Sequence, residues 1–182
     1  MNDKAEKVYA DAFFTLCLEE PPDTLKNTLG ELSALDGIFR EQPDFVKLLG
    51  TPTVTMDEKL GMIKDIIADG ISEYTGNLLC VLTERGRMGC FSGIVKNFRA
   101  LYNEHFRIAE ITVTASAPLS ESVREKIAAK MSEVTGKTVS IKEKVDPSII
   151  GGVVIDYGST RYDGSVRTRL NELKKELGGV IA

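Results

Sequence analysis

The chain has 182 residues, of which 42% are hydrophobic and 27% charged, and its formal net charge at pH 7 is −4. This composition is typical of globular proteins and excludes collagen-like, low-complexity and wholly disordered chains. Residues 1–105 carry 11 Lys and Arg against 17 Asp and Glu, whereas residues 106–182 carry 12 against 10. The two halves therefore differ in charge, −6 against +2, which favours two units with different partners.

The chain is poor in the side chains from which catalytic and metal sites are built. Its three cysteines, Cys17, Cys80 and Cys90, form no CxxC pair, and we expect them to be reduced and packed among apolar neighbours. With His105 as its one histidine, the chain has too few partners for a Ser–His–Asp, Cys–His or zinc site. No glycine-rich phosphate motif opens a helix. We therefore expect no catalysis, no cofactor and no metal.

The sequence also shows no membrane or export signal. No apolar run approaches the roughly 20 residues that a membrane-spanning helix needs. The first seven residues carry charges of both signs and lead into no signal-type apolar core. We expect a protein that is cytosolic or peripheral on a cytosolic face.

Apolar residues recur at helical spacing throughout residues 5–105, in six segments joined by short turns, which predicts a compact helical bundle. Asp23 and Ser72 are expected to cap the second and fifth helices. Thr55 and Glu58 have the spacing of a capping box before the fourth helix. Close helix–helix approach would explain three glycines inside the apolar pattern: Gly30, Gly61 and Gly76.

From residue 111 the apolar period changes from 3.6 to 2. Strands are predicted at residues 111–115, 139–145 and 152–155. Between the first two strands, Ser120 and Gly136 are expected to cap the two ends of a helix. The order strand–helix–strand–strand–helix describes a small α/β domain. The predicted fold is thus α+β overall, with a six-helix bundle in residues 1–105 and an α/β domain in residues 106–182.

The final helix is predicted to follow the turn and capping residues Asp163-Gly164-Ser165. It carries a narrow apolar seam flanked by basic residues. Docking of this seam on another helix and docking on the chain's own sheet explain it equally well. The seam consists of Val166, Leu170, Leu173 and Leu177, and the basic residues beside it are Arg167, Arg169, Lys174 and Lys175.

Several strings match one known family in order along nearly the whole chain. They are Tyr9-Ala10-Asp11-Ala12-Phe13, Asn77-Leu78-Leu79 followed by Glu84–Met88, Ala115 with Pro118-Leu119-Ser120 and, most specifically, Val145–Val154 joined to Asp163–Leu170. The chain resembles the delta subunit of bacterial F-type ATP synthase, whose mitochondrial homologue is the oligomycin-sensitivity-conferring protein. It departs from the family pattern at Thr168, where glycine is frequent, and at Arg161-Tyr162, which replace a more aliphatic segment.

The resemblance implies a non-catalytic stator subunit of the peripheral stalk. Residues 1–105 would bind N-terminal segments of the alpha subunits on the catalytic head, and residues 106–182 would bind the membrane-anchored subunit b. This tether would keep the head from turning with the rotor, so that proton-driven rotation is used for ATP synthesis. The protein would lie on the cytoplasmic face of a bacterial membrane without spanning it, and would bind no nucleic acid.

The same resemblance implies two partner sites. The alpha-subunit site lies between the first and fifth helices, where Tyr9 with Ala12 and Asn77 with Val81 have the spacing of neighbours on one helix face. Packing within the bundle explains these residues equally well. The residues implied for subunit b are Val166, Arg167, Arg169, Leu170 and Leu173.

An alternative from another class is a small RNA- or nucleotide-binding regulator that uses the mildly basic second half, with Arg161, Arg167 and Arg169. The sequence offers little for it, since basic residues interleaved with stacking aromatic residues are missing. The basic turn Arg85-Gly86-Arg87 has the charge to bind a phosphate, although contacts with the end of the preceding helix explain it adequately.

Overall fold

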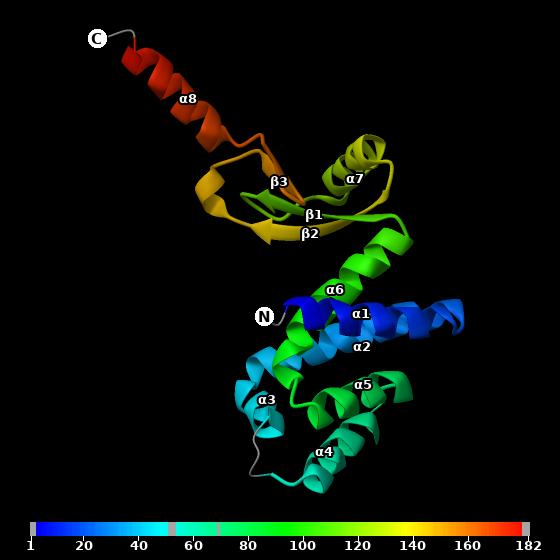
Figure 1. Cartoon of the computed structure of the whole chain (residues 1–182). Coiled ribbons are helices and arrows are strands. Elements are labelled where there is room, and N and C mark those ends of the chain that lie inside the picture. Colours follow the sequence, from blue (N-terminus) through cyan, green and yellow to red (C-terminus); the bar gives the residue numbers. More distant parts are fainter. Residues whose placement is uncertain (1–2, 51–53, 69, 180–182) are drawn as a thin grey trace. The chain divides into compact units, whose positions relative to one another are not determined.

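The computed structural model describes residues 3–50, 54–68 and 70–179 (Figure 1). The chain forms two compact units, Met1–Tyr102 and Asn103–Ala182. The described part of the first unit is helical, whereas the second contains a sheet. The fold is therefore α+β overall.

The first unit is built around the aromatic side chains of α1 and α6. Its helices are α1 (Asp3–Leu18), α2 (Pro22–Glu41), α3 (Pro43–Gly50), α4 (Met56–Ala68) and α5 (Glu73–Glu84), followed by the turn η1 (Met88–Cys90) and α6 (Phe91–His105). Phe98 of α6 is fully buried, and the centre of its ring lies 5.6 Å from the ring centre of Phe13 and 5.5 Å from that of Phe14. Burial of each such ring contributes roughly 1.5–3 kcal/mol before entropic costs. This cluster holds α1 in the unit.

Two of the predicted helix caps are present. The backbone N–H of Thr55 donates to the Glu58 carboxylate at 3.0 Å, and the N–H of Glu58 donates to the Thr55 hydroxyl at 3.4 Å. The Thr55 hydroxyl, which donates to the same carboxylate at 2.8 Å, and the Thr55 N–H lower the pKa of Glu58. At the start of α5, the Ser72 hydroxyl accepts from the N–H of Thr75 at 3.4 Å. Both caps satisfy amide groups that have no partner inside their helix.

Two other expectations about the helices are wrong. Asp23 does not cap α2, because the helix already begins at Pro22, and Asp23 lies in its first turn. The fixed φ of proline suits this first position. Gly30 and Gly61 mark no close helix approach, since a Cβ added at either position would meet no described atom within 4 Å.

The second unit contains a four-stranded mixed sheet in the order β2-β1-β3-β4. Its elements are β1 (Ile108–Ala115), α7 (Glu121–Thr135), β2 (Thr138–Val145), the turn η2 (Pro147–Ile149), β3 (Val153–Tyr157), β4 (Thr160–Asp163) and α8 (Val166–Gly179). The pair β1–β2 is parallel, with α7 as the crossover, whereas β1–β3 and β3–β4 are antiparallel. Met131 of α7 packs with Ile111 and Val113 of β1. Gly136 ends α7 in the left-handed conformation, with φ +65°, as predicted.

Strand β4 was not predicted, and the expected order strand–helix–strand–strand–helix lacks it. All four of its residues are exposed, so they carry no alternation of buried and exposed positions. The strand exists because Tyr157 and Thr160 face each other across a tight turn and continue the pairing of β3. Gly158 supplies the positive φ of +57° in this turn.

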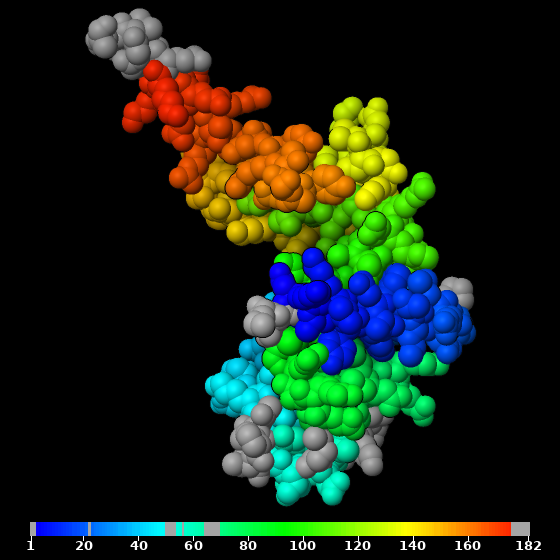
Figure 2. Space-filling view, in the orientation of Figure 1, coloured from blue at the N-terminus to red at the C-terminus, as the bar shows by residue number. Residues whose placement is uncertain are grey.

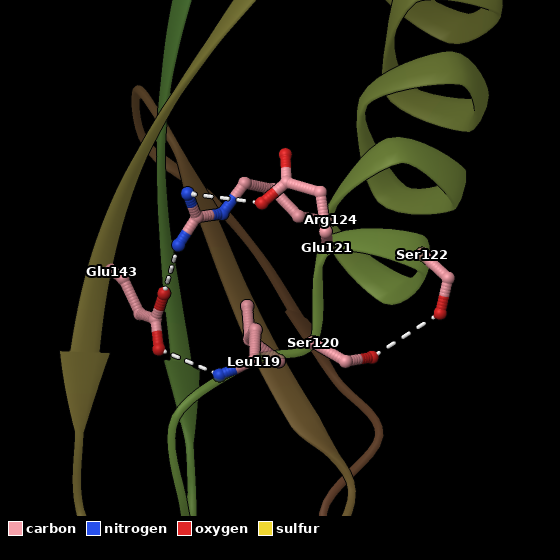
Figure 3. A network of polar contacts seen from close by, with 6 residues as sticks. All are labelled: Leu119, Ser120, Glu121, Ser122, Arg124 and Glu143. Atoms are coloured by element: carbon pink, nitrogen blue, oxygen red, sulfur yellow. Dashed lines mark hydrogen bonds and ion pairs between the residues drawn. The ribbon is translucent and has the colours of Figure 1, made fainter.

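The start of α7 is attached to β2 by the carboxylate of Glu143 (Figure 3). This carboxylate accepts from the backbone N–H of Leu119 at 2.8 Å and from the Arg124 guanidinium at 2.8 Å. The two contacts, that of Leu119 first, lower the pKa of Glu143. Ser120 stands at the N-cap position, but its hydroxyl contacts that of Ser122 at 3.2 Å and no backbone amide. The predicted Ser120 cap is therefore wrong.

The predicted turn and cap before α8 are present. The backbone N–H of Ser165 donates to the Asp163 carboxylate at 2.9 Å, and the N–H of Thr168 donates to the Ser165 hydroxyl at 3.2 Å. The turn also binds the start of β3, because the N–H of Gly164 donates to the carbonyl of Val153 at 3.0 Å. Gly152 allows this close approach, with φ +77° and the Gly164 carbonyl where its Cβ would be.

We expect Glu143→Gln to loosen the start of α7 at neutral pH and to have little effect in acid. Because the folded state lowers the pKa of Glu143, the charged carboxylate stabilises the unit above the unfolded value of about 4.3. This stabilisation is lost as the pH falls through the folded-state pKa. Hydrogen–deuterium exchange of residues 117–145 near pH 7 and pH 3 measures the effect.

Glu133→Gln is the matched control, because Glu133 is an exposed α7 carboxylate that pairs only with Lys130 among the described ion pairs, at 3.0 Å. Such exposed pairs contribute little, so exchange in this variant should equal that of the wild type. Equal protection in all three proteins near pH 7 would contradict the role of Glu143.

We expect Gly152→Ala to destabilise the protein much more than Gly158→Ala. Both glycines have positive φ, but only a Cβ at position 152 collides with the backbone, whereas none of the described atoms lies within 4 Å of one at 158. The left-handed conformation alone costs an alanine about 1–2 kcal/mol, and the collision adds to that. Urea unfolding followed by circular dichroism compares the variants, and equal losses would refute the collision.

Candidate functional site

An apolar groove of about 320 Å³ lies between α1 and α5 of the first unit. Each helix lines it with residues at spacings of three and four, which share one face. The lining residues are Tyr9, Ala12, Phe13 and Leu16 from α1 and Tyr74, Asn77, Leu78 and Val81 from α5. The structure thus brings together the four residues that the sequence assigned to the alpha-subunit site: Tyr9, Ala12, Asn77 and Val81.

The groove has a buried floor and an exposed rim. Phe13 and Leu78 are buried and belong to the core of the unit. Leu16 and Val81 are 45% and 42% exposed, and Ala12 and Asn77 are exposed as well. Packing within the bundle therefore does not account for the rim residues.

Sequence reasoning missed half of the lining. The helical register that relates Tyr9 to Ala12 continues to Leu16, and the register of Asn77 reaches Tyr74. That spacing was the available signal. The sequence contains no such signal for the floor residues, because a core residue and a groove-floor residue have the same apolar character. The residues missed are Phe13, Leu16, Tyr74 and Leu78.

The two ends of the groove carry opposite charges. At one end the Arg87 guanidinium donates to the Tyr9 hydroxyl at 3.2 Å and lies 5.6 Å from the centre of the Tyr9 ring. At the other end, a hydrogen bond with the Glu20 carboxylate raises the pKa of the Tyr74 phenol, and Glu73 adds to the effect. Arg87 of the predicted basic turn thus has a role without a phosphate, because it holds the Tyr9 ring.

A larger hollow of about 630 Å³ lies between α2, α3 and the residues that precede α5. It contains none of the predicted site residues. Glu31 at its edge accepts from the backbone N–H of Ser72 at 3.1 Å and from the Ser72 hydroxyl at 2.6 Å. Its carboxylate therefore stabilises the start of α5.

The apolar seam of α8 is exposed. Val166, Leu170 and Leu173 are 38%, 51% and 53% exposed, and none of the described side chains of α8 belongs to the core beside the sheet. Figure 2 shows no other part of this unit over the side of α8 that faces the viewer. Docking of the seam on the chain's own sheet is therefore wrong for these three residues. The side chain of Leu177 lies outside the described residues.

The basic residues of α8 stand beside this seam. Arg167 donates to the Ser148 hydroxyl of η2 at 3.3 Å, and Arg169 is exposed. A basic flank of this kind attracts carboxylates. The residues assigned to subunit b thus form one exposed surface with an apolar centre and positive neighbours.

The part of the chain that the structure describes contains no cluster of His, Cys, Asp and Glu with the geometry of a metal site. Burial raises the pKa of the Cys17 and Cys90 thiols, which disfavours the reactive thiolate. None of the described helices is both long and apolar enough to cross a membrane.

Comparison with known proteins agrees with these features. The family model of the ATP synthase delta (OSCP) subunit matches residues 5–177. The chain belongs to the ATP synthase delta (OSCP) subunit family. It is accordingly a subunit of an F-type ATP synthase.

A bacterial, a chloroplastic and a mitochondrial relative each match almost the whole chain. ATP synthase subunit delta of Anaeromyxobacter sp. strain Fw109-5 is 34% identical over 93% of this chain and 94% of its own length. Chloroplastic ATP synthase subunit delta of Emiliania huxleyi is 34% identical over 94% and 95%. Mitochondrial ATP synthase subunit O of Ipomoea batatas is 32% identical over 93% and 70%.

A solved structure shares the fold. It is a chain of the Toxoplasma gondii mitochondrial ATP synthase hexamer, with a TM-score of 0.70 and 22% identity over 94% of this chain and 96% of that chain. The agreement covers both units of this chain.

Proposed function

We propose that this protein is the stator subunit that joins the catalytic head of an F-type ATP synthase to its peripheral stalk. Residues 1–105 bind N-terminal segments of the alpha subunits in the groove between α1 and α5. Residues 106–182 bind subunit b through the seam of α8. The protein lies at the cytoplasmic face of the membrane as a peripheral, non-catalytic subunit.

The observation that carries this proposal is the exposed apolar groove between two helices. Such a groove binds an amphipathic helix, whose apolar side chains at spacings of three and four enter it. In this protein the groove rests on buried Phe13 and Leu78, so its shape is maintained without a ligand. Preorganisation of this kind lowers the entropic cost of binding.

The seam of α8 supports the second contact. An exposed row of Val166, Leu170 and Leu173 is costly in water, and the narrow spacing suits packing against another helix. A stator transmits torque and therefore needs strong binding at both ends more than it needs a reaction site. By holding the head against the rotor, this tether supports proton-driven ATP synthesis.

The family assignment favours this function over an RNA- or nucleotide-binding regulator. Of the three arginines on which the alternative depends, Arg161 lies 3.5 Å from the Asp156 carboxylate, and Arg167 donates to Ser148. Neighbouring groups of the same unit thus already contact two of the three.

We expect Tyr9→Asp to weaken binding of an alpha-subunit N-terminal peptide at least about tenfold, because it places a charge in an apolar contact. The measurement is isothermal titration of the peptide into the full chain, with circular dichroism as the check of folding. Val8→Asp is the matched control, since Val8 is 59% exposed and does not line the groove. Unchanged affinity in Tyr9→Asp, or an equal loss in Val8→Asp, would remove Tyr9 from the site.

We expect Leu170→Asp and Leu173→Asp each to weaken binding of the soluble part of subunit b about tenfold or more. Both side chains are exposed, so the melting temperature of the isolated protein should hardly change. Asn171→Asp adds the same charge between them, at an exposed position outside the seam, and should bind nearly normally. Normal binding by both leucine variants would contradict a docking role of α8.

A further inference from the structure

The two ends of the groove between α1 and α5 differ in charge, although the lining between them is almost entirely apolar. Among its lining residues, Asn77 is the sole side chain without apolar or aromatic character. Charged groups stand at its two ends: Arg87 contacts Tyr9, and at the other end Glu20 and Glu73 raise the pKa of the Tyr74 phenol. A helix that lies along the groove therefore meets a cation at one end and carboxylates at the other.

The two helices run in opposite directions along the groove. The start of each helix therefore lies near residues that follow the end of the other. Tyr9, near the start of α1, contacts Arg87, which follows the end of α5. Tyr74, in the first turn of α5, and Glu20, which follows the end of α1, both belong to the opposite end of the groove, where the Glu20 carboxylate raises the pKa of the Tyr74 phenol. The nearby Glu84 and Arg85 are exposed and of opposite sign. The carboxylate of Glu6 lies against Gly93 of α6 and does not line the groove, so the guanidinium of Arg87 is the charge that contacts the lining at this end.

We propose that the groove selects an amphipathic helix with an acidic residue at one end of its apolar face and a basic residue at the other, and binds it in one direction. The acidic end lies at Arg87 and the basic end at Glu20. This inference rests on the proposed function and adds to it the charge pattern and direction of the partner helix.

The length of the groove sets the spacing of the partner's charges. Eleven residues separate Tyr9 from Glu20, which corresponds to about 16 Å at helical rise. The complementary charges on the partner are therefore about three turns apart. Opposite charges at this separation hardly affect each other at physiological salt, so each end acts independently.

Three designed helical peptides with the same apolar face test the charge pattern. One carries Glu and Lys about eleven residues apart, and the others carry Glu at both positions or Lys at both. Titration into the full chain at low salt should show about two- to fivefold tighter binding of the mixed peptide than of either uniform one, as is typical of exposed charge pairs. In 1 M salt, where screening acts within about 3 Å, the three should converge.

A spin label at the acidic end of the mixed peptide tests direction. In the isotopically labelled full chain it should broaden the amide resonances of Tyr9 and Val81 and leave that of Tyr74 sharp. In the variant Glu20→Arg with Arg87→Glu the broadening should move to Tyr74, because both end charges are reversed.

Glu41→Arg with Lys96→Glu is the matched control. Both residues are exposed, on α2 and α6, and neither lines the groove. This variant makes the same two charge reversals and should keep the wild-type direction.

Equal binding of the three peptides, tightest binding of the Lys peptide, or equal broadening at both ends would overturn the inference. Tightest binding of the peptide with Lys at both positions would indicate general attraction to an acidic protein. An alpha-subunit N-terminal peptide that binds without a preferred direction would overturn the inference and leave the proposed function intact. Failure of both the alpha-subunit peptide and the mixed peptide to bind would overturn the proposed function as well.

Discussion

The burial of one face of α1 against Phe98 is the contact on which the groove depends. Phe13 and Phe14 pack on that ring from one side of the helix, and this packing commits α1 to a single rotation about its axis. With that rotation set, Ala12 and Leu16 remain exposed beside α5. An apolar surface that would be costly in an isolated protein is thus maintained by the core beneath it.

The second unit has a small sheet, and the described side chains of its last helix lie outside the core. Glu143 and the turn at Asp163-Gly164-Ser165 provide polar contacts that attach α7 and the start of α8 to the strands. Beyond this turn the described part of α8 exposes its seam. A helix that is anchored at one end and exposes an apolar seam along its described part is suited to pairing with a helix from another chain.

Both surfaces combine an apolar centre with charges at the edge. Apolar burial supplies most of the affinity in such contacts, whereas charge selects partner and orientation. The groove carries both signs and thereby distinguishes its two ends. The seam of α8 has Arg167 and Arg169 beside it and so favours an acidic helix. The difference in charge between the halves of the chain is consistent with two partners of different chemistry.

The sequence by itself determined the helical and strand periods and the Thr55–Glu58 and Ser165 caps, because each depends on residues close together in the chain. It also determined the family, through strings that occur in order along nearly the whole chain. Only the tertiary structure decided that β4 exists, that Ser120 does not cap α7, and that Phe13 and Leu78 are the floor of the groove. The floor of the groove depends on burial between distant segments. The other two features depend on contacts that apolar periodicity does not reveal, namely strand pairing across a tight turn and the contact of Ser120 with Ser122. The opposite charges of Arg87 and Glu20 likewise became meaningful only when folding placed them at the two ends of one groove.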